Sequence, residues 1–371
     1  MIEQFSMQNI NLLVELGYEI HVLSNFSNAG TITNSKAENF KKKLENSNNI
    51  VVYDVEMSRN PISFNNIVSY KKIKKIINSV KFDLVHCQSP VGGVLTRLAS
   101  LRARKDGTKL IYTAHGFHFY KGAPLLNWLI YYPLEMFLSR YTDVLITINR
   151  EDFKNATHFY SRKLLYIPGV GVNTKKFQLT DVNFEKKRLE LGFSINEFII
   201  LSVGELNDNK NHKVIIKALS QIKNSKIHYI ICGIGKNREY LTKYTKKLNM
   251  NKQVHFLGYR SDIDELCKIS NLFVFPSRRE GLGLACLEAM ASGLPILTSN
   301  IHGIKDYSSN GITGFSYSPD DADGFAEGIK YLYENPEMNE RFGNYNKQFV
   351  EIFSREIVDK IMKRLYVEMS S

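Results

Sequence analysis

Short apolar runs alternate with amphipathic segments along most of the chain. The runs are rich in β-branched residues and predict strands, whereas apolar residues three or four positions apart between them predict helices. A first series of predicted strands covers residues 19–25, 50–55, 83–87, 110–114, 144–148 and 164–167. A second series covers residues 198–203, 228–232, 254–257, 272–275, 296–298 and 315–317.

Strands as apolar as these are typical of parallel sheets that helices cover on both faces. Two consecutive series of alternating strands and helices therefore predict an α/β protein with two doubly wound, Rossmann-like domains. We expect a first domain of residues 1–172, which a C-terminal helix at 354–371 rejoins, and a second domain of residues 173–353. Ligands of such sheets bind beyond the carboxyl ends of the strands, so the active site is expected there, in a cleft between the domains.

The bulk properties fit a folded globular protein with two domains in a reducing compartment. A chain of 371 residues exceeds what one hydrophobic core usually supports. It has no apolar run of the length that spans a membrane, and its first residues do not resemble a secretory signal. The four cysteines are far apart and form no CxxC motif, which favours a reducing cytoplasm over disulfide or metal pairing.

The net charge of +12 is unevenly distributed. Residues 1–172 contain 21 Lys+Arg and 13 Asp+Glu (+8), and the remainder contains 28 and 24 (+4). This basic surface favours phosphorylated ligands or an anionic membrane, although an ordinary solvated surface explains it equally well. A nucleic-acid-binding protein is not favoured, because the basic residues are dispersed and no recognition motif is present.

The most informative motif is REGLGLACLEAMASGLP at residues 279–295. A predicted strand ends just before it, a glycine loop follows, and a helix is expected from Leu284. Gly283 allows close approach of a ligand, and the helix start offers free amides to phosphate oxygens. Glu280 lies before the helix and Glu288 within it, a separation that suits the two ends of a sugar nucleotide better than the close acid pair of a hydrolase. A surface helix with two solvated glutamates is the simpler alternative.

Three further strand ends contain candidate residues. Gly204 and Lys210 follow the strand at 198–203, and the lysine can reach a diphosphate. Gly233 begins a turn resembling GxGxxG, but Arg238 replaces the third glycine, so we expect a turn that faces phosphate or ribose. His115 follows the strand at 110–114 and can bind a sugar hydroxyl; a purely structural histidine is the equal alternative.

Together these residues resemble the retaining glycosyltransferases of family 4, which have the GT-B fold. The resemblance covers nearly the whole chain and depends on the E-x7-E spacing of Glu280 and Glu288, the turn from Gly204 to Lys210, and His115. The phrases YTAHGFHFYKGAP, YTDVLITIN and SVGEL are similar to those of bacterial enzymes that assemble capsular and extracellular polysaccharides.

The resemblance implies a nucleotide-sugar donor, expected to be a UDP-sugar, and a role for each candidate residue. Glu288 would bind the ribose and Lys210 would bind the diphosphate. The amides near Gly283 and Leu284 would bind the phosphates and the sugar, and Glu280 and His115 would contact the donor sugar. Tyr259 and Arg260 would border the base. Retention in this family resembles a same-face displacement in which the leaving phosphate accepts the proton. No metal or other cofactor is then expected.

Two departures from the family pattern affect these expectations. Many relatives have arginine where this chain has Glu205, so a phosphate contact from that residue is not expected. Relatives also begin with a strand and a glycine loop before the helix that resembles residues 1–16. That strand would lie in the middle of the sheet, and its absence would leave neighbouring strands unpaired. We therefore expect a damaged first domain, low activity or a natural start upstream of Met1.

The acceptor is expected to be a saccharide or an undecaprenyl-diphosphate-linked saccharide bound by the first domain. Residues 123–141 are rich in leucine and aromatic residues, but they are too short and too interrupted by Pro133 to span a bilayer. They could lie peripherally on the inner face of the plasma membrane or form a buried helix. Two other functions are a non-catalytic sugar-nucleotide binder or assembly partner, and a GT-B epimerase or phosphorylase, for which the sequence has no signal.

Overall fold

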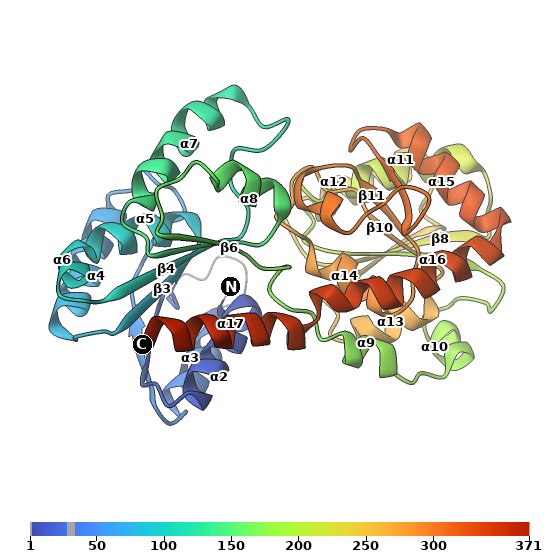
Figure 1. The fold of residues 1–371 in the computed structure, drawn as a ribbon. Coiled ribbons are helices and arrows are strands. Elements are labelled where there is room, and N and C mark those ends of the chain that lie inside the picture. The colour runs from blue at the N-terminus through green and yellow to red at the C-terminus, as the bar shows by residue number, and fades with distance from the viewer. Residues whose placement is uncertain (1, 28–33, 371) are drawn as a thin grey trace. The chain divides into compact units, whose positions relative to one another are not determined.

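The computed structural model describes residues 2–27 and 34–370 and divides the chain into two compact units (Figure 1). The first unit contains residues 1–170 and 356–371, and the second contains residues 171–355. The predicted join between residues 172 and 173 is two residues from the observed one. All twelve predicted strands are present, which confirms the α/β fold class.

The described residues of the first unit form six parallel strands in two separate sheets. Its strands are β1 (Ile20–Ser24), β2 (Ile50–Asp54), β3 (Leu84–Gln88), β4 (Lys109–Ala114), β5 (Val144–Thr147) and β6 (Lys163–Tyr166). Its helices are α1 (Ile2–Phe5), α2 (Met7–Glu15), α3 (Asn34–Glu45), α4 (Asn65–Ser79), α5 (Pro90–Ala99), α6 (Leu101–Lys105), α7 (Leu125–Ser139), α8 (Arg150–Ala156) and α17 (Arg355–Ser370).

The sheet of the first unit is divided where the sequence predicts a missing strand. β1 pairs with β2 in one sheet, and β3, β4, β5 and β6 pair in that order in the other. In the described part of the chain no strand joins β1 to β3. β1 and β3 therefore each lie at the edge of a sheet among the described residues.

Helices cover both faces of these two sheets. On one face, Ile20 and Val22 of β1 pack with Ile10 of α2 and Leu44 of α3. The same face of β3 contacts α17, where the buried Tyr366 hydroxyl lies 3.0 Å from Nδ1 of His86. On the other face, β1 and β2 pack against α4 and α5 through an apolar cluster.

A buried ion pair joins α5 to α7 within the first unit. Arg97 donates to Glu135 at 2.8 Å, and its guanidinium lies 4.0 Å from the ring centroid of Tyr112. Both charged side chains are almost fully buried, and their pairing offsets the desolvation that burial would otherwise impose on each. The pair fixes α7 to the domain.

α7 has one buried face and one exposed apolar face. The aromatic residues Trp128, Tyr131 and Tyr132 pack against the core around Phe119. The exposed apolar face, which we call the α7 outer face, consists of Leu125, Leu126, Leu129, Ile130, Leu134 and Phe137. The buried-helix interpretation of residues 123–141 is thus correct for one face, and contact of the other face with a membrane stays a prediction. No helix among the described residues is long and apolar enough to cross a membrane.

The second unit contains one continuous parallel sheet. Its strands are β7 (Phe198–Val203), β8 (Ile227–Cys232), β9 (Val254–Gly258), β10 (Leu272–Phe275), β11 (Ile296–Ser299) and β12 (Gly314–Tyr317), in the order β12-β11-β10-β7-β8-β9. Its helices are α9 (Thr174–Leu179), α10 (Phe184–Glu190), α11 (His212–Ile222), α12 (Arg238–Lys247), α13 (Ile263–Ile269), α14 (Leu284–Ala291), α15 (Ala322–Glu334) and α16 (Pro336–Phe349), with 3-10 turns η1 (His302–Asp306) and η2 (Val350–Phe353).

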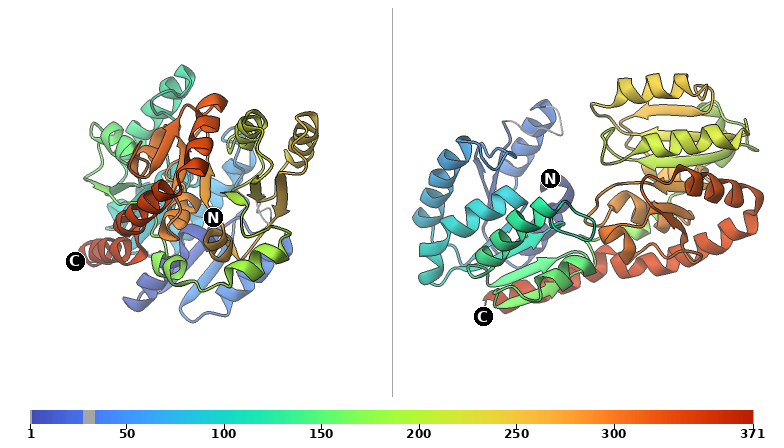
Figure 2. Two further views of the ribbon diagram at one scale, coloured as in Figure 1. Left: turned by 90° about the vertical axis from the view of Figure 1, so that its right-hand side faces the viewer. Right: turned by 90° about the horizontal axis from the view of Figure 1, so that it is seen from above.

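Helices lie on both faces of this second sheet (Figure 2). α11 packs against α12 and α15 and contacts β8, whereas α13 and α14 contact β7, β10 and β11. All residues of β8 and β10 are buried, as expected for central strands that helices cover on both sides. The four cysteines of the chain are free and buried.

Candidate active site

Lys210 and Glu280 form a direct ion pair at the carboxyl edge of the second sheet. Lys210 lies in the loop between β7 and α11, where its amide donates to Oδ1 of Asn207 at 2.9 Å. Its ammonium group contacts the Glu280 carboxylate and lies 4.5 Å from the ring centroid of Phe275. The loops after β7 and β10 are thus joined by one charged contact, which places a cation beside the start of α14.

Glycines let the two loops after β7 and β8 approach each other. A Cβ atom on Gly204 would lie 3.2 Å from Cδ and Cε of Lys210. Gly233 has a φ of +154°, and a Cβ there would lie only 1.9 Å from the carbonyl oxygen of Gly204. No side chain fits at Gly233, so glycine is required for the contact that supports Lys210.

α14 begins with a glycine and has no side-chain cap. Gly283 adopts a φ of +99°, and a Cβ there would lie 2.6 Å from the Phe275 ring. Leu284 is the first residue of the helix, so its amide and that of Ala285 lack an intrahelical acceptor. Free amides and the positive end of the helix dipole favour an anion at this position.

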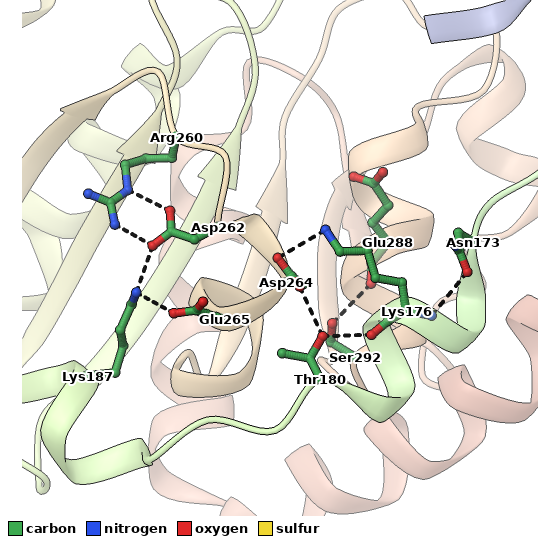
Figure 3. A network of polar contacts seen from close by, with 10 residues as sticks. All are labelled: Asn173, Lys176, Thr180, Lys187, Arg260, Asp262, Asp264, Glu265, Glu288 and Ser292. Carbon is green, nitrogen blue, oxygen red and sulfur yellow. Dashed lines mark hydrogen bonds and ion pairs between the residues drawn. The ribbon is translucent and has the colours of Figure 1, made fainter. Parts of the chain in front are cut away.

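Glu288 lies one turn into α14 and is partly buried. Burial raises the pKa of this carboxyl group to about 7, while nearby Lys176 lowers it and Asp264 raises it. Among the described residues, the Glu288 carboxylate has no hydrogen-bond partner, whereas Lys176 pairs with Asp264 at 3.3 Å (Figure 3). A carboxylate in this position can accept hydrogen bonds from the hydroxyl groups of a ligand.

Arg260 belongs to a charged network rather than standing alone. Its guanidinium binds both carboxylate oxygens of Asp262, with Nε at 2.8 Å from Oδ1. Lys187 joins Asp262 and Glu265 (Figure 3). Hydrogen bonds from Arg260 and Lys187 hold the pKa of Asp262 well below its usual range. The neighbouring Tyr259 is 67% exposed, so its ring is accessible to a planar base.

His115 lies in the first unit, directly after β4. Its Nε2 is 2.8 Å from Oε1 of Gln88, and its ring centroid is 5.4 Å from that of Phe5. Burial lowers the pKa of His115 to about 4, so the imidazole is neutral at physiological pH. A small pocket at this edge is lined by His115, Gln88, Thr113, Phe5, Gln8 and Met362, among others.

The structure brings most of the sequence candidates of the second unit together. The loops that meet there contain Gly204, Lys210, Gly233, Glu280, Gly283 and Leu284. Gln88 was not a sequence candidate, although it ends a strand and the other candidates also lie at strand ends. Lys176 and Asp264 were not candidates either, because the sequence contains no signal for them. Among residues 2–27 and 34–370, no cluster of His, Cys, Asp and Glu could hold a metal ion.

Comparison with known proteins identifies both units. A family model described as glycosyl transferase 4-like matches residues 5–149, and one described as glycosyl transferases group 1 matches residues 183–349. The chain is 35% identical over 357 residues to EpsD of Bacillus subtilis (strain 168), which is named as a glycosyltransferase, with 95% of this chain and 90% of EpsD covered.

A second relative supports the family assignment, and a solved structure supports the fold. The UDP-Gal:alpha-D-GlcNAc-diphosphoundecaprenol alpha-1,3-galactosyltransferase of Escherichia coli is 32% identical over 323 residues, covering 84% of this chain and 82% of the enzyme. The crystal structure of Anabaena Alr3699/HepE in complex with UDP matches with a TM-score of 0.75 at 18% identity, covering 94% of this chain and 100% of the other. The chain therefore belongs to the family 4-like, group 1 glycosyltransferases and is a glycosyltransferase with the GT-B fold.

Proposed function

We propose that the second unit binds a UDP-sugar at the loops after β7 and β10. The pair of Lys210 and Glu280 beside the uncapped start of α14 is the observation that carries the proposal. The diphosphate binds Lys210 and the amides of Leu284 and Ala285. The ribose hydroxyls donate to Glu288, whose carboxylate has no other hydrogen-bond partner among the described residues. Tyr259 and Arg260 border the base.

Donor binding exchanges the partner of Lys210. In the unliganded chain this lysine neutralises Glu280, so neither charge is left unpaired in a partly buried place. A diphosphate offers Lys210 a stronger anionic partner, and the released Glu280 accepts hydrogen bonds from the donor sugar. The ion pair of Lys210 with Glu280 thus has two roles. It joins the two loops before the donor binds, and it leaves the Glu280 carboxylate available to the sugar once the diphosphate binds Lys210.

The chemical step requires stabilisation of the phosphate that leaves. Lys210 and the first-turn amides of α14 face the diphosphate, and they stabilise the negative charge that develops as the sugar departs. The leaving phosphate accepts the proton of the acceptor hydroxyl on the same face, with retention at the sugar. His115 of the first unit, neutral at physiological pH, can hydrogen-bond a sugar hydroxyl. The donor needs no metal in this proposal, so chelator should leave transfer unchanged.

We propose a lipid-linked saccharide as the acceptor. The E. coli relative takes its name from a diphosphoundecaprenol-linked acceptor. An acceptor of this kind lies in a membrane, and the α7 outer face of the first unit offers an apolar helix surface to it. The excess of basic residues in the first half of the chain attracts anionic headgroups at the cytoplasmic face. The expected setting is surface polysaccharide assembly.

Transfer assays with purified protein test the proposal. UDP-galactose, UDP-glucose and UDP-N-acetylglucosamine are each supplied with a synthetic diphospholipid-linked N-acetylglucosamine, with and without chelator. We expect one donor to yield a product whose mass has increased by that donor's sugar residue, and Glu280→Ala to abolish this product. Glu239→Ala, at an exposed position on α12, is the matched control. Product formation that survives Glu280→Ala would contradict the assigned site.

A further inference from the structure

Lys187 of α10 is bound by two carboxylates at the start of α13. Its ammonium nitrogen lies 2.8 Å from Oδ2 of Asp262 and also contacts Glu265 (Figure 3). Hydrogen bonds to Asp262 and Glu265 raise the pKa of Lys187, so the group stays charged. The side chain is only 14% exposed, unlike a lysine whose ammonium group faces water. Its charge is therefore used within the second unit.

Asp262 connects Lys187 to Arg260. Nε of Arg260 donates to Oδ1 of Asp262 at 2.8 Å, and Nη2 donates to Oδ2, the oxygen that Lys187 also binds. Two parallel bonds of this kind fix the plane of a guanidinium group relative to the carboxylate. Because Lys187 holds the same carboxylate from a second direction, the three side chains form one fixed unit.

Main-chain contacts place Arg260 beside the proposed donor site. The carbonyl of Gly258, two residues before Arg260, accepts from the amide of Gly233 at 2.7 Å. Gly233 in turn packs against Gly204, which touches the Lys210 side chain. Lys210 follows β7 and Arg260 follows β9, two strands away in the order β7-β8-β9. Neighbouring strands are about 4.8 Å apart, so the two loops are separated by about 10 Å, which suits a diphosphate at one and a base at the other.

Arg260 keeps part of its donor edge free for a ligand. Its Nε and Nη2 are used by Asp262, whereas Nη1 has no hydrogen-bond partner in residues 2–27 and 34–370. The side chain is 31% exposed, so a ligand can reach it. A guanidinium group has hydrogen-bond donors and no acceptor. The free edge therefore fits a carbonyl oxygen and not an amino group.

Pyrimidine bases differ in this respect. Uracil has a carbonyl oxygen at C4, as thymine does, whereas cytosine has an amino group that donates hydrogen bonds. We propose that Lys187 is a positioning residue for base selection, which directs Arg260 through Asp262 at the C4 carbonyl of uracil. The inference rests on the proposed UDP-sugar site, and it adds a residue and a physical basis for the choice of base.

The role of Lys187 follows from what its loss would leave. Asp262 and Arg260 would remain as an isolated pair that can turn together on two flexible side chains. Hydrogen bonds weaken steeply as their angle departs from linearity, and an unfixed side chain loses entropy when a ligand orders it. Loss of Lys187 should therefore weaken recognition of the base and spare the diphosphate, which binds Lys210 and the start of α14.

Isothermal titration of the full chain with UDP, CDP and inorganic diphosphate tests the proposal. UDP and CDP differ at the C4 substituent of the base, and inorganic diphosphate has no base. The test variant is Lys187→Met. The matched control is Lys186→Met, at the neighbouring exposed lysine of the same helix, whose side chain forms no ion pair within the described part of the chain.

We expect the parent protein and Lys186→Met to bind UDP at least roughly tenfold more tightly than CDP. Lys187→Met should lose most of this preference and bind inorganic diphosphate as the parent does. Lys187→Arg, which keeps a cation, should retain most of the preference. Arg260→Met should also lose it, and adding Lys187→Met to that variant should change the ratio no further, because the lysine acts through Arg260.

Three results would overturn the proposal. The first is an unchanged ratio of UDP to CDP affinity in Lys187→Met, or no preference in the parent protein. The second is an equal loss of affinity for UDP, CDP and inorganic diphosphate in Lys187→Met, which would indicate a purely structural lysine. The third is a further fall of the ratio in the double variant. Each of these leaves the proposed transferase function standing, because that function depends on Lys210 and Glu280.

Discussion

Lys210 is bound by Glu280 across seventy residues of sequence, and the two charges meet at the start of α14. The contact joins the residue proposed to hold the donor diphosphate to the one proposed to hold the donor sugar. Their pairing in the unliganded protein means that donor binding must break or share this bond. The two residues should therefore respond differently to substitution.

Replacing each partner separates these roles. We expect Lys210→Met to weaken UDP binding roughly tenfold to hundredfold, because a hydrogen bond to a charged group is lost. Glu280→Gln should leave UDP binding unchanged or tighter, since Lys210 loses its competitor, while transfer falls by roughly a hundredfold. Isothermal titration with UDP and a coupled transfer assay measure both effects. A loss of UDP affinity in Glu280→Gln equal to that in Lys210→Met would contradict the exchange of partners.

Donor binding should depend on pH through Glu288. Burial raises the pKa of the Glu288 carboxyl group to about 7, so about half of these groups are protonated at pH 7 before the donor binds. Ribose hydroxyls favour the ionised form, so affinity for UDP-galactose should rise by up to tenfold per pH unit below about pH 7 and level off above it, with proton release on binding. Calorimetry in buffers of different ionisation enthalpy detects the proton. Glu288→Gln should remove the dependence, and an unchanged pH profile in that variant would refute the assignment.

The same group affects the stability of the unliganded protein. Folding raises the pKa of this carboxyl group. Between the unfolded and the folded pKa, the group is therefore protonated in the native state and ionised in the unfolded chain. Its contribution to the free energy of unfolding therefore falls as pH rises from its unfolded value to about 7. Melting temperatures of Glu288→Gln and the parent protein should diverge over this range, with the variant the more stable at higher pH. The exposed Glu239→Gln should follow the parent throughout.

The start of α14 should not tolerate a side chain. Gly283→Ala places a Cβ at a φ of +99° and 2.6 Å from the Phe275 ring, whereas Gly192→Ala, at a φ of +82°, meets no atom within 4 Å. Gly192→Ala, the control, should lower the free energy of unfolding by about 1–2 kcal/mol because of its backbone conformation alone. Gly283→Ala should lower the free energy of unfolding by roughly 1–3 kcal/mol more, because its Cβ overpacks the site, and it should weaken UDP binding. Scanning calorimetry and UDP titration measure the two effects, and equal losses in both variants would argue against a crowded glycine.

The α7 outer face should bind anionic bilayers. Replacing Leu125, Leu126 and Leu129 with serine removes apolar surface that is already exposed, so the fold should remain intact while vesicle binding falls at least about tenfold. Leu179→Ser with Leu189→Ser, two exposed positions in the second unit, is the control. Sedimentation with vesicles that contain or lack anionic lipid measures binding, and raised salt should weaken it. Unchanged binding of the triple variant would exclude this surface.

Much of the fold was predictable because it depends on local patterns. Apolar runs identify strands such as β7 and β10, and their order predicts two doubly wound units. The divided sheet was also expected, from comparison with the family pattern. The pairing of Lys210 with Glu280 was not, because no periodicity indicates which of the many charges in the chain will meet. The bidentate contact of Arg260 with Asp262 could likewise be seen only once the turn between them was formed.

Residues such as Gln88 and Lys176 show why a site is harder to predict than a fold. Gln88 contacts His115 because β3 and β4 are neighbours, a relationship set by the order of strands. Lys176 influences Glu288 from α9, more than one hundred residues away in the chain. Neither belongs to a motif, and both act through tertiary packing.

The return of α17 to the first unit has a practical consequence for dissecting this enzyme. Tyr366 is fully buried against His86, so a segment that follows the whole second unit in the chain completes the first unit. A gene fragment that stops at residue 170 would encode a unit without one of its walls, and loss of α17 would damage the first unit and spare the second. The first unit can therefore finish folding only after α17 has been synthesised.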